Sequence, residues 1–318
     1  MWTKNLVSCL EESTAGHPRV DEAIAIKEQH LPKRVYKYRC DTGYARDVLN
    51  ADSVWMASPE TYNDPYDSRL TFPLDALLAL LEAALVDPFV AATKLKGVIS
   101  PEEIENAKKS PEPLKSILQR MRLLKLPSAT HYWGQKAESY SAELLHHAKS
   151  AVSQLADFRK QAKVCSFSAV SDSLLMWSHY ANHHKGFCIE YDLEPLSAGH
   201  FFRKNLYPVM YSKDFYDLNP FMKGLTGGSR QQLRHMFPLV AMLHKFDGWE
   251  YEKEWRLMSE TQNIIEDYKQ PAPIPAKIFL GARFDTSTGK DLLGICQQKG
   301  IPIARMRLAE HKFALSPE

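Results

Sequence analysis

A long helical block separates two regions of strand-like sequence, and this interruption constrains the fold more than any other feature. Residues 75–160 show the apolar periodicity of helices. Short alternating strand patterns occupy residues 33–68 before the block and residues 162–310 after it. The sequence therefore predicts a single α+β domain over residues 1–318. Its sheet core is expected in the two flanking regions, with a helical insertion over about residues 69–160.

The local patterns also predict individual elements of this core. The expected strands are, in chain order, 34–39, 54–58, 163–168, 186–191, 208–211, 250–258, 277–280 and 301–306. The expected helices are 21–30, 44–52, 138–160, 171–181, 230–245 and 287–299. Asp41 is expected to cap the helix that begins at residue 44.

The composition excludes several classes of protein. Of the 318 residues, 44% are hydrophobic and 25% are charged, which is typical of a globular chain. The formal net charge of +2 indicates no general affinity for nucleic acid or membrane. The 5 cysteines are scattered, which argues against a disulfide framework. The longest apolar run, 77–86, is interrupted by Glu82, so we expect a cytoplasmic protein without membrane contact.

Polar and aromatic residues concentrate in a few short segments. These segments are Tyr36–Arg39, Asn63–Asp67, Ser166–Ser168, Met176–Gly186 and Trp249–Arg256. The Asn63–Asp67 segment also has the composition of a turn, because Asn and Asp bond to their own backbone and Pro fixes φ.

The last of these segments carries the densest charge. If 250–258 is a strand, alternate side chains share a face, so Glu250, Glu252 and Glu254 lie together with Arg256. Carboxylates in a row repel one another unless a cation or a ligand lies beside them. The segment is therefore either an ion-pair strip with Arg256 or a carboxylate pair directed into a cleft.

A metal site is a weaker hypothesis. His179 and His183 are four residues apart, which places them on one face of a helix, but no third ligand is spaced to join them. We therefore predict no metal. The alternative is a metal-dependent hydrolase or nuclease, and its ligands would come from Asp64, Asp67, His179, Glu252 and Glu254.

Several motifs resemble a known family. They are Asn-Asp-Pro-Tyr-Asp at 63–67, Ser-Phe-Ser at 166–168, Met-Trp-Ser-His-Tyr at 176–180, His-Lys-Gly-Phe at 184–187 and Trp-Glu-Tyr-Glu-Lys-Glu-Trp-Arg at 249–256. Their order over about residues 34–283 is similar to that of the bacterial family called domain of unknown function 2971. This resemblance supplies no activity, because the family's function is unassigned.

A second resemblance does imply an activity. Arg39 ends an early expected strand, Ser166-Phe167-Ser168 lies on a middle one, and Glu252-Lys253-Glu254 lies on a later one. This order is similar to the Arg, Ser-x-Ser and Glu-x-Glu pattern of bacterial mono-ADP-ribosyltransferases. The resemblance implies a mixed, mostly antiparallel split-sheet core that holds NAD in a cleft. The helical insertion does not belong to that pattern, and Glu250 leaves the carboxylate register open.

The resemblance to the transferases also implies roles for particular residues. Arg39 would bind an NAD phosphate, and Ser166 would orient the catalytic carboxylate. Glu254 would stabilise the charge that develops as the glycosidic bond breaks, and Glu252 would position or deprotonate the acceptor. The resemblance thus implies Glu254 and Glu252 as the catalytic residues. The expected NAD-binding residues are Arg39, Tyr38, Tyr36, Ser166, Phe167, Ser168, Asn63, Asp64, His179 and Tyr180.

The leading hypothesis is therefore an NAD-dependent mono-ADP-ribosyltransferase or NAD glycohydrolase. It implies an acceptor that is a protein, a nucleic acid or water. It also implies a toxin or phage-defence effector with a cognate inhibitor or antitoxin. Besides the metal-dependent alternative, a non-catalytic binding or sensor module stays open, because the same clusters can hold a fold or a ligand.

Overall fold

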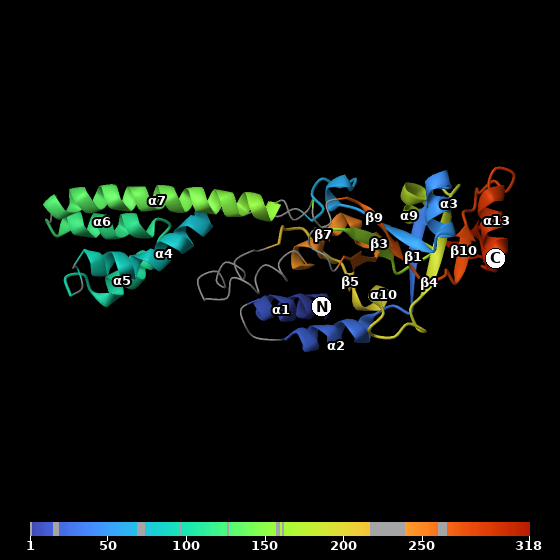
Figure 1. Cartoon of the computed structure of the whole chain (residues 1–318), viewed down its shortest axis with the longest axis horizontal. Coiled ribbons are helices and arrows are strands. Elements are labelled where there is room, and N and C mark those ends of the chain that lie inside the picture. Colours follow the sequence, from blue (N-terminus) through green and yellow to red (C-terminus); the bar gives the residue numbers. More distant parts are fainter. Residues whose placement is uncertain are drawn as a thin grey trace.

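The computed structural model describes residues 2–14, 19–68, 74–93, 95, 97–125, 127–156, 160, 162–216, 239–259 and 266–318. The molecule is elongated, with a strand-rich body at one end and a helical arm at the other (Figure 1). No helix in these ranges has the length and apolar character that a membrane span requires.

The body is built on an open 8-stranded sheet. Its strands, from one edge to the other, are β12 (Leu315–Pro317), β11 (Ile303–Leu308), β10 (Lys277–Leu280), β4 (Phe187–Asp192), β1 (Arg34–Arg39), β3 (Val164–Ser168), β8 (Glu254–Met258) and β5 (Leu206–Pro208). Every neighbouring pair is antiparallel except β10 and β11, which are parallel. The expectation of a mixed α+β fold with a mostly antiparallel sheet is confirmed. The eight strands form one continuous sheet.

Two short ribbons lie beside the main sheet. Strands β2 (Ser53–Met56) and β9 (Tyr268–Pro271) pair antiparallel, whereas β6 (Met210–Ser212) and β7 (His244–Phe246) pair parallel. The β6–β7 ribbon places Tyr211 opposite Lys245. Both residues contribute to the polar site described below.

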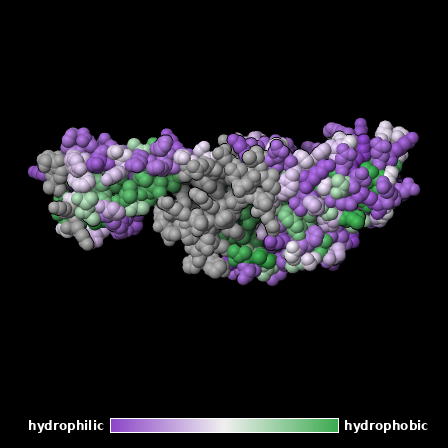
Figure 2. All heavy atoms as spheres, viewed as in Figure 1, coloured by the Kyte–Doolittle hydropathy of each residue, from purple (hydrophilic) through white to green (hydrophobic). Residues whose placement is uncertain are grey.

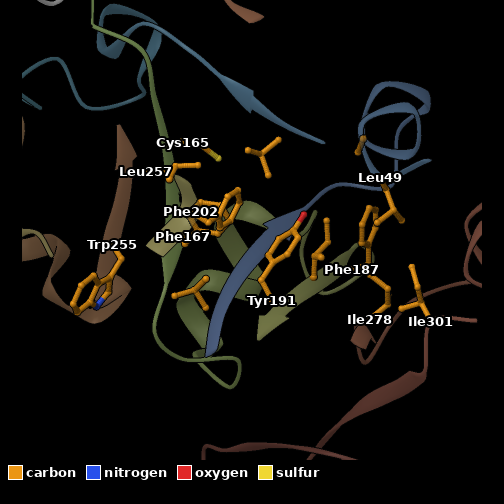
Figure 3. Close-up of a cluster of buried hydrophobic side chains, with 14 of the residues drawn as sticks. Leu49, Cys165, Phe167, Phe187, Tyr191, Phe202, Trp255, Leu257, Ile278 and Ile301 are labelled. Atoms are coloured by element: carbon orange, nitrogen blue, oxygen red, sulfur yellow. The ribbon is translucent and has the colours of Figure 1, made fainter. Parts of the chain in front are cut away.

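One face of the sheet packs against helices through a large apolar core. The helices are α3 (Gly43–Asn50), α10 (Phe201–Lys204) and α13 (Lys290–Lys299), which contribute Leu49, Phe202 and Cys296 respectively. Figure 3 shows the aromatic centre of this core, where Phe167 of β3 and Tyr191 of β4 lie beside Phe202. We call this side of the sheet the core face.

The opposite side, which we call the polar face, carries a smaller apolar cluster and the polar site. Helix α9 (Leu174–Tyr180) covers it through Trp177, which is fully buried against Tyr38. The indole nitrogen of Trp177 donates to the carbonyl of Ser171 at 2.8 Å, which fixes the ring. The β1–β3 and β3–β8 registers place Tyr36, Ser168 and Glu254 side by side on this face.

The inserted helices form an arm with a core of its own. They are α4 (Leu74–Ala92), α5 (Pro101–Lys108), α6 (Pro113–Leu123) and α7 (Pro127–Ala156). Ser100 and Glu103 form a capping box that starts α5, and Pro101 occupies its first turn. Phe89, Ile117 and Met121 are buried between these helices. In Figure 2 hydrophobic residues appear between the helices of the arm and hydrophilic residues along its outer side.

The base of the arm shares an apolar cluster with the body. Leu77 of α4 and Ala148 of α7 pack in the same cluster as Leu6 of α1 (Trp2–Thr14) and Val164 of β3. Helix α2 (Val20–His30) packs beside α1 and contributes Ala23. The insertion is therefore joined to the sheet by apolar contact as well as by the chain.

The elements differ from the sequence predictions at a few places. Thr42 caps α3 instead of Asp41, which pairs with Arg46 at 2.9 Å. Residues 244–246 form β7 instead of the end of a helix, and the part of that predicted helix at 230–238 lies outside the described residues. The predicted strand 250–258 begins only at Glu254, because the preceding residues form the 3-10 helix η2 (Asp247–Glu252). Strands β9 and β12 and helix α1 were not predicted.

Candidate functional site

Arg256 is the centre of a buried charge network on the polar face. Its side chain is completely inaccessible to solvent. Its guanidinium donates to Glu254 Oε1 at 2.8 Å and to Asp67 Oδ2 at 2.6 Å. It also donates to Ser68 Oγ at 3.0 Å and to the carbonyl of Met242 at 2.6 Å. A planar guanidinium with several directed donors suits this arrangement, which a lysine could not reproduce.

Lys245 is the second cation of the network. Its ammonium lies 2.6 Å from Glu252 Oε2 and 2.8 Å from Glu254 Oε2. It also lies 3.6 Å from Asp67 Oδ2. The Trp249 ring centre is 5.3 Å away, so the ammonium also has a cation–π partner. Lys245 therefore bridges the two glutamates that the sequence marked as catalytic.

The backbone before β8 directs these glutamates inward. Lys253 has φ 45 in the left-handed region, at the junction between η2 and β8. Its exposed ammonium pairs with the exposed Glu250 at 3.1 Å. Glu252 and Glu254, each 4% exposed, meet at Lys245. The expectation that Glu250 shares their face was wrong, because residues 247–252 do not alternate as a strand.

The turn at residues 63–68 supplies the third carboxylate. Asp64 accepts from the backbone N–H of Tyr66 at 2.8 Å, which forms the predicted turn. Ser68 follows with φ 54, and its hydroxyl donates to Asp67 Oδ1 at 2.8 Å. The turn thereby delivers Asp67 to Arg256, which lies 189 residues further along the chain.

The two glutamates have opposite electrostatic character. Burial raises the pKa of Glu252 above its usual range, although Lys245 opposes this effect. Burial would also raise the pKa of Glu254, but Arg256 and Lys245 outweigh burial and hold that pKa far below its usual range. With Asp67, three carboxylates face two cations, so one negative charge is in excess. Of the two glutamates, Glu252 is the one that more readily takes up a proton and so removes the excess charge.

Glu252 is also the member of the network nearest to half-exposed residues. The hydroxyl of Tyr180 donates to Glu252 Oε1 at 2.6 Å, and the exposed amide of Asn63 lies 3.5 Å from that hydroxyl. Tyr36, Tyr180 and Tyr251 are partly buried and pack against the same apolar cluster on the polar face. We call these three tyrosines the aromatic rim. The exposed ring of His179 lies 6.3 Å from Tyr251.

Opposite pKa shifts predict opposite pH dependences for two variants. In the unfolded chain the pKa of Glu252 has its ordinary value of 4.5, and in the folded protein this pKa is raised. The folded protein therefore binds the Glu252 proton more tightly than the unfolded chain does. The contribution of this proton to the free energy of unfolding is therefore fully present below pH 4.5. It is lost as the pH rises through the pKa that Glu252 has in the folded protein. We expect Glu252→Gln to gain stability relative to wild type between about pH 4 and pH 7.

The matched variant should behave in the opposite way. Because the pKa of Glu254 is lowered in the folded protein, its ionised form adds to the free energy of unfolding of the wild type. This contribution is present above pH 4.5 and is lost at lower pH. Glu254→Gln should therefore lose stability relative to wild type as the pH rises. Urea unfolding at a series of pH values measures both variants. Identical pH trends for the two variants would contradict the assignment of the shifts.

Three further expected site residues lie on the polar face of β3 and β1. Ser168 is buried, and its hydroxyl donates to the backbone carbonyl of Glu252 at 2.7 Å. It therefore holds the end of η2, which the resemblance did not imply. Ser166 lies opposite Arg256 in the β3–β8 register and is half-buried. Tyr38 is buried, and its hydroxyl donates to the carbonyl of Val170 at 2.8 Å.

The structure does not bring all expected site residues together. Phe167 lies in the apolar core of the core face, so it cannot stack on a ligand beside Glu252. Arg39 pairs in register with Phe187, which also belongs to the core face. Arg39 is therefore separated from Glu252 and Glu254 by the sheet. Its position does not support the expected contact with a phosphate of a ligand held on the polar face.

Some central residues were missed by sequence reasoning. Lys245 lay inside a predicted helix, and Tyr211 ended a predicted strand. Tyr211 accepts from the backbone N–H of Glu254 at 2.8 Å. Tyr62 lies with its ring centre 5.8 Å from the Arg256 guanidinium. No local pattern distinguishes these residues, because their partners come from distant segments.

Comparison with known proteins supports one of the resemblances. A sequence model of the family described as "Protein of unknown function (DUF2971)" matches residues 176–257. This range begins in α9 and ends in β8, so it includes Tyr180, Lys245, Glu252 and Glu254. No curated protein and no solved structure matches the chain. The similarity to ADP-ribosyltransferases stays a prediction from the motif order.

Proposed function

We propose that this protein is an enzyme that breaks the nicotinamide–ribose bond of NAD, with Glu252 as the catalytic carboxylate. The observation that carries the proposal is the environment of Glu252. It is a buried carboxyl with a raised pKa, held by the Tyr180 hydroxyl and the Lys245 ammonium beside the aromatic rim. Carboxyl groups whose pKa is displaced towards neutrality are typical of catalytic acids and bases.

The proposed reaction uses one carboxylate twice. The bond from ribose C1′ to the nicotinamide nitrogen breaks, and its electron pair stays on nicotinamide, which becomes neutral. The ionised Glu252 stabilises the positive charge that develops on the ribose. Water or an acceptor hydroxyl then bonds to C1′, and Glu252 takes the released proton and passes it to solvent. The products are nicotinamide, ADP-ribose or its conjugate, and one proton.

The proposal moves the catalytic role from Glu254 to Glu252. Glu254 is paired with two cations, Lys245 and Arg256, whereas Glu252 is paired with Lys245 alone. A carboxylate so neutralised has little charge to offer a developing cation. In this proposal Glu254 holds Lys245 and Arg256, while Lys245 and Tyr180 position Glu252.

The aromatic rim is suited to bind a flat ring such as the nicotinamide of NAD. Tyr180 contacts the carboxylate, and Tyr36 and Tyr251 pack on the same apolar cluster as Tyr180. All three are partly accessible, and a nicotinamide ring would stack on such a ring surface. Asn63 offers an exposed amide next to Tyr180, which would pair with the nicotinamide carboxamide. His179 is also exposed at this edge and is available to a ligand.

The acceptor is part of the same proposal. Water would make the protein an NAD glycohydrolase, and a protein or nucleic-acid acceptor would make it a mono-ADP-ribosyltransferase. Loss of cellular NAD is how such an enzyme would act as a toxin or phage-defence effector. A cognate inhibitor or antitoxin would then cover Asn63 and the aromatic rim.

A non-catalytic binding module is the second candidate, and one observation favours it. The network is almost fully compensated, since Asp67 and Glu254 pair with Arg256 and Lys245 at 2.6 to 2.8 Å. Such a network can serve only to hold the turn, β7 and β8 in place. The metal-dependent hydrolase has less support. In the described part of the chain, no group of three or more His, Cys, Asp or Glu side chains could hold a metal ion.

Cleavage of NAD is tested by measuring what happens to its nicotinamide and to its adenine. Purified protein is incubated with NAD labelled in the nicotinamide and in the adenine, without added metal, with and without a bacterial extract. We expect nicotinamide release, with the adenine label either free as ADP-ribose or attached to an extract component. NAD that stays intact under both conditions would overturn the proposal and favour the binding module.

A further inference from the structure

Two cations on the core face of β1 have no carboxylate partner. Lys37 and Arg39 alternate with Tyr36 and Tyr38 along the strand, so both point away from the Glu252 site. Within the described residues, no Asp or Glu oxygen lies within ion-pair distance of either side chain. Both are half-buried. Uncompensated charge in such a place is unfavourable unless an anion or water reaches it.

The contacts of Lys37 show how its ammonium is held. It donates to the backbone carbonyl of Ser166 at 2.5 Å and lies 5.6 Å from the ring centre of Phe167. A carbonyl and an aromatic ring leave further donors of the ammonium without a partner. Burial lowers the pKa of Lys37, and the Glu254 charge across the sheet opposes this effect without forming an ion pair with it. Within the described part of the chain, the Arg39 guanidinium makes no side-chain hydrogen bond or ion pair.

The carboxylates around this pair are already held by other cations. Asp41 pairs with Arg46 at 2.9 Å, Asp52 with Lys299 at 2.8 Å and Asp267 with Lys163 at 2.9 Å. Lys37 and Arg39 therefore have no ion-pair partner among the described residues. In contrast, the network around Arg256 has an excess of carboxylate. The two faces of the sheet thus offer opposite charge to a ligand.

Aromatic residues come from α3 and β2, two elements that pack on the same face of the sheet as this pair. Tyr44, an exposed residue of α3, and Trp55 of β2 meet edge to face with ring centres 5.5 Å apart. Burial raises the pKa of Tyr44 to about 12, and the Arg39 charge opposes this rise, which indicates that Arg39 is near. Arg39 likewise opposes the raised pKa of Tyr191, a core residue of β4.

We propose that Lys37 and Arg39, with Tyr44 and Trp55, form a binding site for a phosphate that is attached to a flat aromatic group. A nucleoside monophosphate is the simplest ligand of this class. Two donors about 7 Å apart at their Cα atoms, on one face of a strand, span a phosphate group. The base would lie against Tyr44 and Trp55. This site lies across the sheet from Glu252 and does not depend on the proposed cleavage of NAD.

The test measures binding of AMP to the full chain by isothermal titration calorimetry. We expect Arg39→Gln and Lys37→Met each to weaken AMP binding by roughly tenfold or more, because each removes a charge-assisted contact. Lys33→Gln is the matched control, since Lys33 is exposed, lies just before β1 and pairs with Glu194 instead. Inorganic phosphate should compete with AMP, and adenosine should bind much more weakly than AMP.

Two variants distinguish AMP binding at this site from NAD cleavage at Glu252. Glu252→Gln should bind AMP as wild type does, and Arg39→Gln should keep any nicotinamide release. The melting temperature of each variant shows that it is folded, and Arg39→Lys should restore part of the affinity. The inference is overturned if AMP does not bind wild type at millimolar concentration. It is equally overturned if Arg39→Gln and Lys33→Gln bind AMP alike, or if Glu252→Gln abolishes AMP binding.

Discussion

Replacing Arg256 by methionine is expected to lower the free energy of unfolding by about 3 to 5 kcal/mol. The guanidinium is fully buried and holds Asp67, Glu254, Ser68 and the Met242 carbonyl. Methionine has a similar volume, so the loss arises from buried carboxylates left without a partner and not from a cavity. The urea midpoint of the variant, analysed with the wild-type m value, measures this loss.

Arg120→Met is the matched control for this change. Arg120 lies on α6 and pairs with Glu103 at 2.7 Å, but both side chains are about one-third exposed. Removal of a surface ion pair costs well under about 1 kcal/mol. Equal losses in the two variants would mean that the Arg256 network does not stabilise the fold. A loss confined to Arg256→Met would show that the turn at 63–68 and the β7–β8 region are held together by this one side chain.

Glu252→Gln is expected to lower the rate of nicotinamide release by about 10² to 10⁴-fold. Glutamine keeps the shape and still accepts from the Tyr180 hydroxyl, but it carries no charge and takes up no proton. Lys245 retains Glu254 and Asp67, so the variant should stay folded. Initial rates at saturating NAD, with the unfolding midpoint of each sample, measure the two effects separately.

Glu250→Gln provides the control for charge and position. Glu250 is two residues away and exposed, and it pairs only with Lys253 at 3.1 Å among the described residues. The same chemical change there should leave the rate at the wild-type level. If both variants retain the wild-type rate, Glu252 is not catalytic. If both lose activity equally, the effect arises from the net charge of the segment.

The strands of the body could be predicted because their signal is local. Alternating apolar residues mark β1, β3, β4 and β10 within one or two residues of their observed ends. Strand β7 was misread because His244–Phe246 follows an apolar run that also suits a helix. The η2 helix was misread because Glu250–Arg256 alternates in sequence although only β8 alternates in the structure.

The site could be predicted only in part, because its composition depends on strand register. The sequence identified Glu252, Glu254, Asn63 and Tyr180, which the structure brings together. The network joins residues as far apart as Asp67 and Arg256, and no local pattern reports such a contact. Tyr36 pairs with Ser168 and so lies on the polar face, which places Arg39 on the opposite face. This register could not be predicted from the sequence.

The turnover of Glu252→Gln relative to Glu254→Gln, each divided by its folded fraction, tests the central assignment most directly. Glu252 has a raised pKa and adjoins the aromatic rim, whereas Glu254 is neutralised by Lys245 and Arg256. The account predicts that Glu252→Gln is well folded and almost inactive, while Glu254→Gln is less stable but active per folded molecule. An active Glu252→Gln beside an inactive, fully folded Glu254→Gln would contradict it.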